Sequence, residues 1–204
     1  MNFATIIKSI AVAAALVAGS AHASNELITN GSFEALNGSD TLTSGNWSTY
    51  SSIPGWISDF GIEVRHNVAG AAADRNYFVE LDTDRNSSMQ QLVGTTLGQH
   101  YTLSFAFQDR EHVDTNSQGI QVLWGTQDLG TFNNSSVWKT MTFDVVGTGS
   151  NVALTFLAAG NSDSYGTSLD SVSLTSAVPE PETYGMLLAG LGLVGFAARR
   201  KAAK

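Results

Sequence analysis

The stretch Tyr101-Thr-Leu-Ser-Phe-Ala-Phe107 alternates large apolar side chains with small ones at a period of two. In a β-strand this period places the odd-numbered residues, three aromatic rings and one leucine, on one face, and the small residues on the other. A face this apolar has to be buried against a second layer. The stretch therefore predicts one strand of a layered β structure.

Other short stretches show the same pattern between clusters of Gly, Asn, Asp and Ser, and no stretch between the termini shows a sustained helical period. The additional predicted strands are Glu26–Thr29, Ile62–Arg65, Tyr77–Leu81, Ser88–Leu92, Gly119–Trp124, Met141–Val145, Val152–Phe156 and Leu169–Leu174. Many short antiparallel strands predict an all-β fold, and a jelly-roll β-sandwich is the simplest way to bury their apolar faces.

The first 23 residues have the features of a signal peptide. Lys8 is their only cation, an apolar run follows from Ile10 to Val17, and Ala21-His22-Ala23 is the small-x-small pattern that signal peptidase cleaves. We predict a signal peptide over 1–23, cleavage after Ala23 and export through the inner membrane. An uncleaved membrane anchor is the alternative.

The chain ends in VPEPETYGMLLAGLGLVGFAARRK, residues 178–201. The apolar run 184–198 would form a helix about 22 Å long, shorter than a hydrocarbon core of about 30 Å. The cations Arg199, Arg200 and Lys201 favour the cytoplasmic side. We therefore predict a linker over 176–183, a short transmembrane helix over 184–198 and a basic cytoplasmic tail over 199–204.

This tail resembles the PEP-CTERM sorting signal of Gram-negative bacteria. The tripeptide Pro179-Glu180-Pro181, a short glycine-rich apolar helix and the cluster Arg199-Arg200-Lys201 follow one another in the order typical of that signal. The resemblance implies recognition of Pro179, Glu180 and Pro181 by an exosortase, a membrane protease. It also implies transient anchoring and release to the cell surface or extracellular matrix, in species that usually make exopolysaccharide. A plain C-terminal anchor is the alternative.

The predicted domain between the termini, residues 24–175, is strongly acidic. It contains five basic and sixteen acidic side chains, a net charge of −11, compared with −8 for the whole chain. Such a surface repels phosphate backbones, which argues against nucleic acid as a partner and leaves neutral sugars and calcium. The chain has no cysteine, so an exported domain must be stabilised by its core, by a metal, or by both.

This domain resembles the galactose-binding-like jelly rolls, which include carbohydrate-binding modules and the DUF642 proteins. The segments that carry the resemblance are Leu27-Ile-Thr-Asn-Gly-Ser-Phe-Glu34, Trp56 after Pro54-Gly55, Tyr77-Phe-Val-Glu-Leu-Asp82, Gln91 at a strand end, and Leu169-Asp170-Ser-Val-Ser-Leu174. The resemblance implies a single jelly roll with a carbohydrate as its ligand.

In many of these sandwiches a calcium ion joins the first strand to the last, and the resemblance implies Glu34 and Asp170 as its carboxylate ligands. A Ca²⁺ ion takes several oxygen ligands and would suit a chain without disulfides. The alternative is that both acids cap turns or pair with Arg75 or Arg85.

A second set of oxygen-bearing side chains occurs in Asp82-Thr-Asp84-Arg-Asn86. They stand at alternate positions, as do the first ligands of a calcium-binding loop. Ser87 stands where an EF-hand needs glycine, and Val93 stands where it needs glutamate, so this is not an EF-hand. A polar turn is the preferred interpretation, with a second calcium site as the alternative.

Sugar binding requires exposed aromatic rings that stack on the C–H face of a pyranose. Trp47, Tyr50 and Trp56 cluster in a part of the sequence without clear strands, and we choose them as candidate ligand-binding residues. Each ring also fits a core position. The further candidates are Trp124, which we expect in the core, Trp138 and Tyr165.

Catalytic patterns are weak. The histidines lack metal-binding spacing, and neither a nucleophile elbow nor a phosphate-binding loop occurs. Glu111 and Asp114 lie in an acidic loop over 109–116 that could hold a glycosidase pair, although a solvated loop is the simpler interpretation. We therefore expect a non-enzymatic surface or matrix protein that binds polysaccharide. The alternatives are a purely structural matrix protein and an exopolysaccharide hydrolase.

Overall fold

The computed structural model of the protein describes residues 25–176, 185 and 188–192. Residues Ser24–Ala177 form one compact unit, and every buried apolar side chain among the described residues belongs to this unit. It therefore has its own hydrophobic core and can be produced without the two ends of the chain. The predicted signal peptide with its cleavage after Ala23, the Pro-Glu-Pro motif 179–181 and the basic cluster 199–201 lie outside the described residues.

Part of the predicted apolar helix 184–198 is described. Residues 185 and 188–192 are helical, and the side chains of Leu188 and Leu191 are exposed. Within the described ranges, the helical residues do not make a helix with the length and hydropathy needed to span a membrane.

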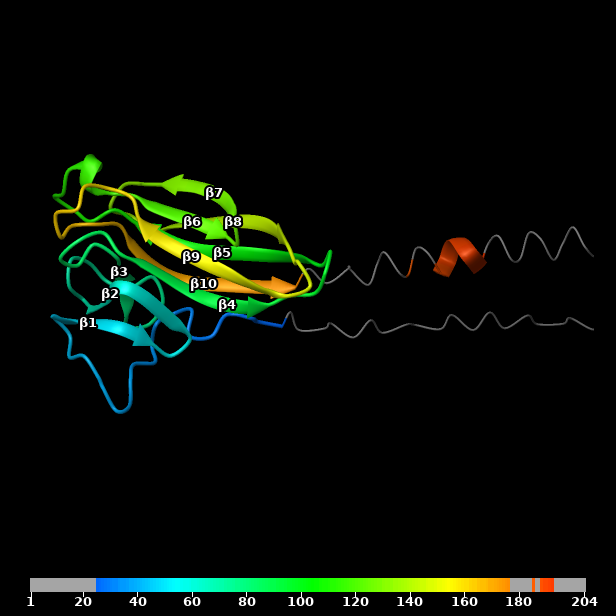
Figure 1. The fold of residues 1–204 in the computed structure, drawn as a ribbon, viewed down its shortest axis with the longest axis horizontal. Helices are drawn as coiled ribbons and strands as arrows, with labels where there is room; N and C mark the ends of the chain where they lie inside the picture. The colour runs from blue at the N-terminus through cyan, green and yellow to red at the C-terminus, as the bar shows by residue number, and fades with distance from the viewer. Residues whose placement is uncertain (1–24, 177–184, 186–187, 193–204) are drawn as a thin grey trace, which may run out of the picture. The chain divides into compact units, whose positions relative to one another are not determined.

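The compact unit is built almost entirely from β-strands (Figure 1). One short 3₁₀ helix, η1, covers Thr115–Ser117. The strands are β1 (Asn46–Ile53), β2 (Trp56–His66), β3 (Phe78–Glu80), β4 (Ser88–Gly94), β5 (His100–Gln108), β6 (Ile120–Trp124), β7 (Gln127–Phe132), β8 (Lys139–Val146), β9 (Asn151–Ala158) and β10 (Ser168–Ser176).

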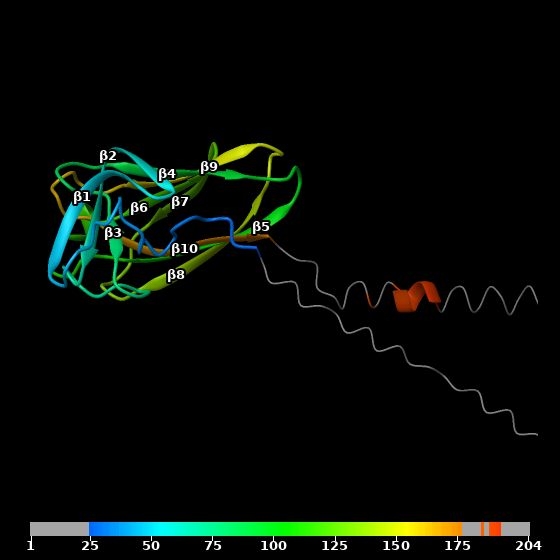
Figure 2. The same cartoon turned by 90° about the horizontal axis from the view of Figure 1, so that it is seen from below.

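The strands form one continuous antiparallel ladder that folds into two layers. The order is β7-β6-β9-β4-β2-β3-β10-β5-β8, with β1 paired to β2. Strand β2 joins the layers, because its first residues pair with β4 and its last residues pair with β3. Figure 2 shows β4 and β9 on one side of the sandwich and β8 and β10 on the other. The predicted all-β jelly-roll sandwich is confirmed.

The change of partner along β2 takes place at Gly61. A Cβ atom at this position would lie 2.6 Å from Thr49 Cγ2 on the neighbouring strand, so any other residue would have to displace the Thr49 side chain. The glycine therefore allows β1 to pack closely against the part of β2 where the chain passes from one layer to the other.

The core lies between the two layers and is rich in aromatic rings. Phe105, from the stretch that predicted the fold, is fully buried and has ring contacts with centroid separations of 5.3 to 6.1 Å. Its own ring partners are Phe107, Phe132, Phe143 and Phe156, from β5, β7, β8 and β9. The four odd-numbered residues of 101–107 are all buried, so this predicted face is confirmed.

Three parts of the predicted strand pattern are wrong. Residues 46–61, which we predicted to lack strands, form β1 and the first half of β2, and residues 127–132 form β7. These strands are rich in Ser, Thr, Asn, Asp and Gly, and many of their side chains are exposed, so no apolar alternation marks them. The predicted strand Glu26–Thr29 is reduced to one bridge between Glu26 and Thr175.

We expect Phe105→Ala to lower the free energy of unfolding of the unit 24–177 by about 3–5 kcal/mol, because it leaves a cavity at the centre of the aromatic cluster. Denaturant unfolding measures this loss. Leu97→Ala, at an exposed position, is the control and should change stability by no more than about 0.5 kcal/mol. Equal effects of the two substitutions would contradict the described core.

Candidate functional site

A pocket of about 240 Å³ lies at the end of the sandwich where β10 begins. It is formed by β1, β2 and the loops that follow β2, β3 and β5 or precede β10. The lining residues are Trp47, Glu63, Arg65, Val68, Thr83, Asp84, Arg110, Ser164 and Tyr165. We call this the end pocket.

The floor of the end pocket is a buried charge network. Arg65 is only 2% exposed; its Nε atom lies 2.5 Å from Glu63 Oε1, and its Nη1 atom forms an ion pair with Glu80. Glu63 and Glu80 are direct partners across the β2–β3 ladder. Two carboxylates opposite each other repel, so Arg65 supplies the charge that allows both to be buried.

Glu80 lies beneath the pocket and is fully buried. Its Oε1 atom accepts a hydrogen bond of 3.0 Å from the backbone N–H of Gly166. This bond holds the loop before β10 against the charge network. Burial raises the pKa of Glu80 to about 7, although the neighbouring Arg65 guanidinium opposes the rise. This side chain therefore exchanges its proton near neutral pH.

Two aromatic rings form the rim of the end pocket. Trp47 is 56% exposed and pairs with Arg65 across the β1–β2 ladder, so the two side chains project from the same face. Tyr165 is 45% exposed, and the guanidinium carbon of Arg110 lies 4.7 Å from its ring centroid. A cation–π contact of this kind holds the ring and the cation next to each other. The rim thus offers flat apolar surfaces beside hydrogen-bond donors and acceptors.

A second cavity of about 210 Å³ lies beside Trp138 and includes Glu111 and Asp109 in its lining. Asp109 is buried and fastens two loops, because it accepts hydrogen bonds from Thr167 Oγ1 at 2.8 Å and Asn134 N at 2.9 Å. Burial raises the pKa of Asp109. Of the predicted glycosidase pair, Glu111 lines this cavity and Asp114 does not.

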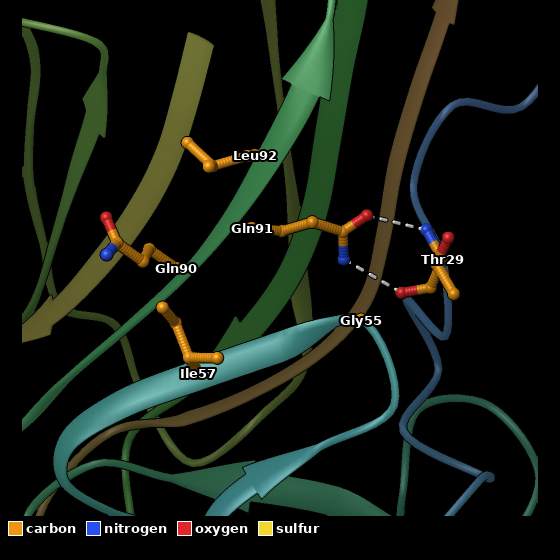
Figure 3. A pocket seen from close by; sticks show the side chains of 6 residues that line it. All are labelled: Thr29, Gly55, Ile57, Gln90, Gln91 and Leu92. Atoms are coloured by element: carbon orange, nitrogen blue, oxygen red, sulfur yellow. Dashed lines mark hydrogen bonds between the residues drawn. The ribbon is translucent and has the colours of Figure 1, made fainter. Parts of the chain in front are cut away.

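A third hollow, of about 320 Å³, lies where the N-terminal segment meets β2 and β4 (Figure 3). The amide of Gln91 binds both backbone groups of Thr29, at 2.8 and 2.9 Å. Gly55 has a φ angle of +85°, and a Cβ atom there would lie 2.7 Å from the Thr29 carbonyl oxygen. The hydrogen bonds beside this hollow hold the N-terminal segment against the sandwich.

Residues 26–175 match the family described as "Protein of unknown function (DUF642)". The chain belongs to the DUF642 family. Residues 177–201 match the PEP-CTERM protein-sorting motif, so both resemblances found in the sequence are confirmed. No curated protein matches the chain.

Several solved structures are similar to the DUF642 domain at low identity. A family 35 carbohydrate-binding module from Clostridium thermocellum is 12% identical over 65% of this chain and all of its own, with a TM-score of 0.45. TmCBM61, solved in complex with β-1,4-galactotriose, is 15% identical over 76% of this chain and all of its own, with a TM-score of 0.49. These values are too low to transfer a ligand or a residue role.

The three candidate aromatic residues have different positions in the DUF642 domain. Trp47 lies on the rim of the end pocket, and Tyr50 is half-buried and packs against the core. Trp56 is only 1% exposed, and its indole N–H donates to the Asn30 carbonyl at 3.1 Å. Its ring contacts other core rings, so the prediction that it meets a ligand is corrected: Trp56 is a core residue.

The remaining aromatic candidates also lie in different places in the domain. Trp124 is buried, as predicted, and Trp138 lies in the second cavity, where its indole N–H donates to the Ala71 carbonyl at 2.9 Å. Tyr165 shares the end pocket with Trp47. The sequence analysis missed Arg65, Glu80 and Arg110. Arg65 and Glu80 could have been recognised as charged residues inside the predicted strands 62–65 and 77–81.

The predicted calcium ligands Glu34 and Asp170 anchor one loop of the DUF642 domain. Glu34 Oε1 accepts hydrogen bonds from the backbone N–H groups of Asn76 and Tyr77, both at 2.8 Å. Asp170 Oδ2 accepts those of Ala73 and Asp74 at 2.8 and 2.9 Å. These hydrogen bonds anchor the loop 73–77, as in the turn-capping alternative. A calcium ion at this position stays a prediction.

In the part of the chain that the structure describes, no three acidic or histidine side chains gather in a way that could hold a metal. Any metal bound there would need amide oxygens, backbone carbonyls or water as additional ligands.

We expect the DUF642 domain to be more stable at about pH 5 than at about pH 8. Burial raises the pKa of Glu80 to about 7 and that of Asp170 to about 6. The ordinary pKa is 4.5 for Glu80 and 3.8 for Asp170. At a pH between its ordinary and its raised pKa, each group keeps a proton in the folded protein that it has lost in the unfolded chain. Stability should therefore fall as the pH rises through this window, on the order of 1 kcal/mol per group.

Melting temperatures of the unit 24–177 across this range measure the effect. Glu80→Gln is the matched variant, because it removes the group that titrates near neutral pH and should flatten the upper part of the profile. A wild-type domain that gains stability from about pH 5 to about pH 8 would contradict the described burial of these carboxyls.

Proposed function

We propose that this protein is an exported, non-enzymatic surface or matrix protein whose DUF642 domain binds polysaccharide in the end pocket. The observation that carries the proposal is the pair of partly exposed rings, Trp47 and Tyr165, on the rim of a pocket that is also lined by charged side chains. Two exposed rings on the rim of one pocket offer flat apolar surface to the same ligand.

The chemistry of the rim matches that of a sugar ring. A pyranose has an apolar C–H face, which stacks on an aromatic ring, and hydroxyl groups around its edge, which both donate and accept hydrogen bonds. Arg110 donates, Asp84 accepts, and Ser164 does both. All three line the same pocket as the two rings, so both kinds of contact are available to one ligand.

The charge of the domain supports a neutral ligand. Its five basic and sixteen acidic side chains give a net charge of −11, which repels polyanions. A neutral polysaccharide avoids this repulsion. Because the chain carries a PEP-CTERM sorting motif, we propose that the ligand is exopolysaccharide of the producing cell and that the protein acts in its biofilm matrix.

The floor of the pocket supports binding in preference to bond cleavage. A glycosidase needs two carboxyl groups that flank the scissile bond and are free to exchange protons with it. Here Arg65 pairs with both Glu63 and Glu80, and Glu80 is fully buried. These two carboxyls are therefore occupied in stabilising the floor and are poorly placed to act on a substrate.

The sorting motif supports a route by which the domain is delivered. We propose that signal peptidase removes residues 1–23, that residues 184–198 hold the chain in the inner membrane, and that an exosortase then processes the tail. Strand β10 has nine residues between the end-pocket side of the sandwich and Ser176, a length of about 30 Å. The end pocket and Ser176 therefore lie at opposite ends of this strand.

The binding proposal predicts that Trp47→Ala and Tyr165→Ala each weaken the affinity of the unit 24–177 for a bound polysaccharide by about tenfold or more. The polysaccharide is chosen by screening immobilised glycans and matrix material, and the affinity is measured by calorimetry. Phe60→Ala is the matched control, because Phe60 is as exposed as Trp47 at 56% but lies outside the end pocket.

Three results would overturn the binding proposal. Absence of any glycan binding would favour a purely structural matrix protein. Release of reducing ends from matrix material, lost in Glu111→Gln or Asp114→Asn, would favour a hydrolase. An equal loss of affinity in Phe60→Ala would place the binding site elsewhere on the domain.

The sorting proposal predicts that a triple alanine substitution of Pro179, Glu180 and Pro181 leaves the protein with the cells and out of the medium. Intact mass spectrometry of the released wild-type protein should give a chain that starts at Ser24 and lacks the apolar run. The same protein expressed in a host without its exosortase is the control. Unchanged release in that host would contradict the proposal.

A further inference from the structure

A second cluster of oxygen atoms lies beside the end pocket, between the loop 82–86 and the loop 160–164. Asp82 and Asn86 are partners in an isolated antiparallel bridge, and side chains of such a pair project to the same side. The loop before β10 closes over them, because Asp82 Oδ2 accepts hydrogen bonds from the backbone N–H groups of Asp163 and Ser164, at 2.9 and 3.1 Å.

Two buried oxygens in this cluster have no donor. Asp82 is 1% exposed, and neither its Oδ1 atom nor the Oδ1 atom of Asn86 has a hydrogen-bond partner. The orientation of the Asn86 amide is fixed, because its Nδ2 atom donates to the Gly160 carbonyl at 2.7 Å and a flip would place two oxygens together. Both free atoms are therefore acceptors, and neither can satisfy the other.

A third acidic group lies close to this pair. The Asp163 carboxylate repels that of Asp82 and contributes to the raised pKa of Asp82, after the larger effect of burial. Its Oδ2 atom accepts a hydrogen bond from Ser117 at 2.5 Å, which ties the carboxylate to the helix η1. No ion pair with a cation is formed by Asp82 or Asp163 among the described residues.

We propose that the oxygens of Asp82 and Asn86, with Asp163 nearby, form a binding site for a calcium ion. A buried acceptor without a donor is costly, and a hard cation satisfies several such oxygens at once. Calcium fits better than magnesium, because carboxylate and amide oxygens from irregular loops suit its flexible shell of six to eight ligands. Backbone carbonyls and water complete the shell. This site is distinct from Glu34 and Asp170.

The bound ion would order two walls of the end pocket. Thr83 and Asp84 belong to the first loop of the cluster, and Ser164 and Tyr165 belong to the second loop or follow it directly. The metal site itself does not rest on the proposed function, since its evidence is the set of unsatisfied oxygens. Failure of sugar binding would leave it intact.

The test is the melting temperature of the unit 24–177 in CaCl₂ and in EGTA, together with calorimetric titration of CaCl₂. We expect saturating calcium to raise the melting temperature by about 5 °C, and we expect magnesium at the same concentration to have a smaller effect. In Asp82→Asn the calcium response should disappear. This variant should be at least as stable as the wild type in EGTA, because the new amide can donate to Asn86 Oδ1.

Two further variants complete the design. Asn86→Asp should increase the calcium response and lower stability in EGTA, because it adds a third negative charge. Glu34→Gln should keep the wild-type response. The proposal is overturned if the wild type shows no calcium response, since a bridging water or a shared proton then satisfies the oxygens. It is also overturned if Glu34→Gln removes the response and Asp82→Asn does not, which would place the ion at Glu34 and Asp170.

Discussion

The ion pairs of Arg65 with Glu63 and Glu80 are the constraint on which the candidate site depends. They bury three charged side chains beneath the end pocket and link β2 to β3 where the two glutamates face each other. Removing one partner of such a network leaves an uncompensated buried charge, which costs far more than the network contributes. A shift of the strands by one residue would turn every side chain to the opposite face. The charge network therefore supports the register of β2 against β3, which keeps Arg65 at the floor of the end pocket.

The loops around this network are held by one recurring type of hydrogen bond. Carboxylates of the sandwich accept backbone N–H groups of a loop far away in the sequence: Asp170 holds Ala73 and Asp74, Glu80 holds Gly166, and Asp82 holds Asp163 and Ser164. Each of these bonds joins residues more than 80 positions apart along the chain. This chain has no cysteine. Such long-range hydrogen bonds connect distant segments of the chain, as disulfides do in many exported domains. They also explain why so many acids are buried in this domain.

The sequence predicted the parts of the fold where one face of a strand is apolar and the other is not. The period of two in 101–107 was sufficient to place Phe105 in the core. It failed for β1 and β7, whose polar side chains carry no such pattern, and it could not separate the buried Trp56 from the exposed Trp47. The residues of β3 are buried on both faces, so no alternation marked Glu80 as a buried charge. The roles of Glu34 and Asp170 depend on loops brought near by the fold, which spacing along the chain cannot reveal.

The central claim is that a polysaccharide meets the domain at Trp47, on the rim of a pocket whose floor is Arg65 with its two glutamates. The chain has four tryptophans, and each indole N–H gives its own signal in a ¹H–¹⁵N spectrum. Adding the bound glycan should shift the signal of Trp47 and leave those of the buried Trp56 and Trp124 unchanged. A shift confined to Trp138, in the second cavity, or no shift of Trp47 under conditions where the glycan binds, would contradict the account.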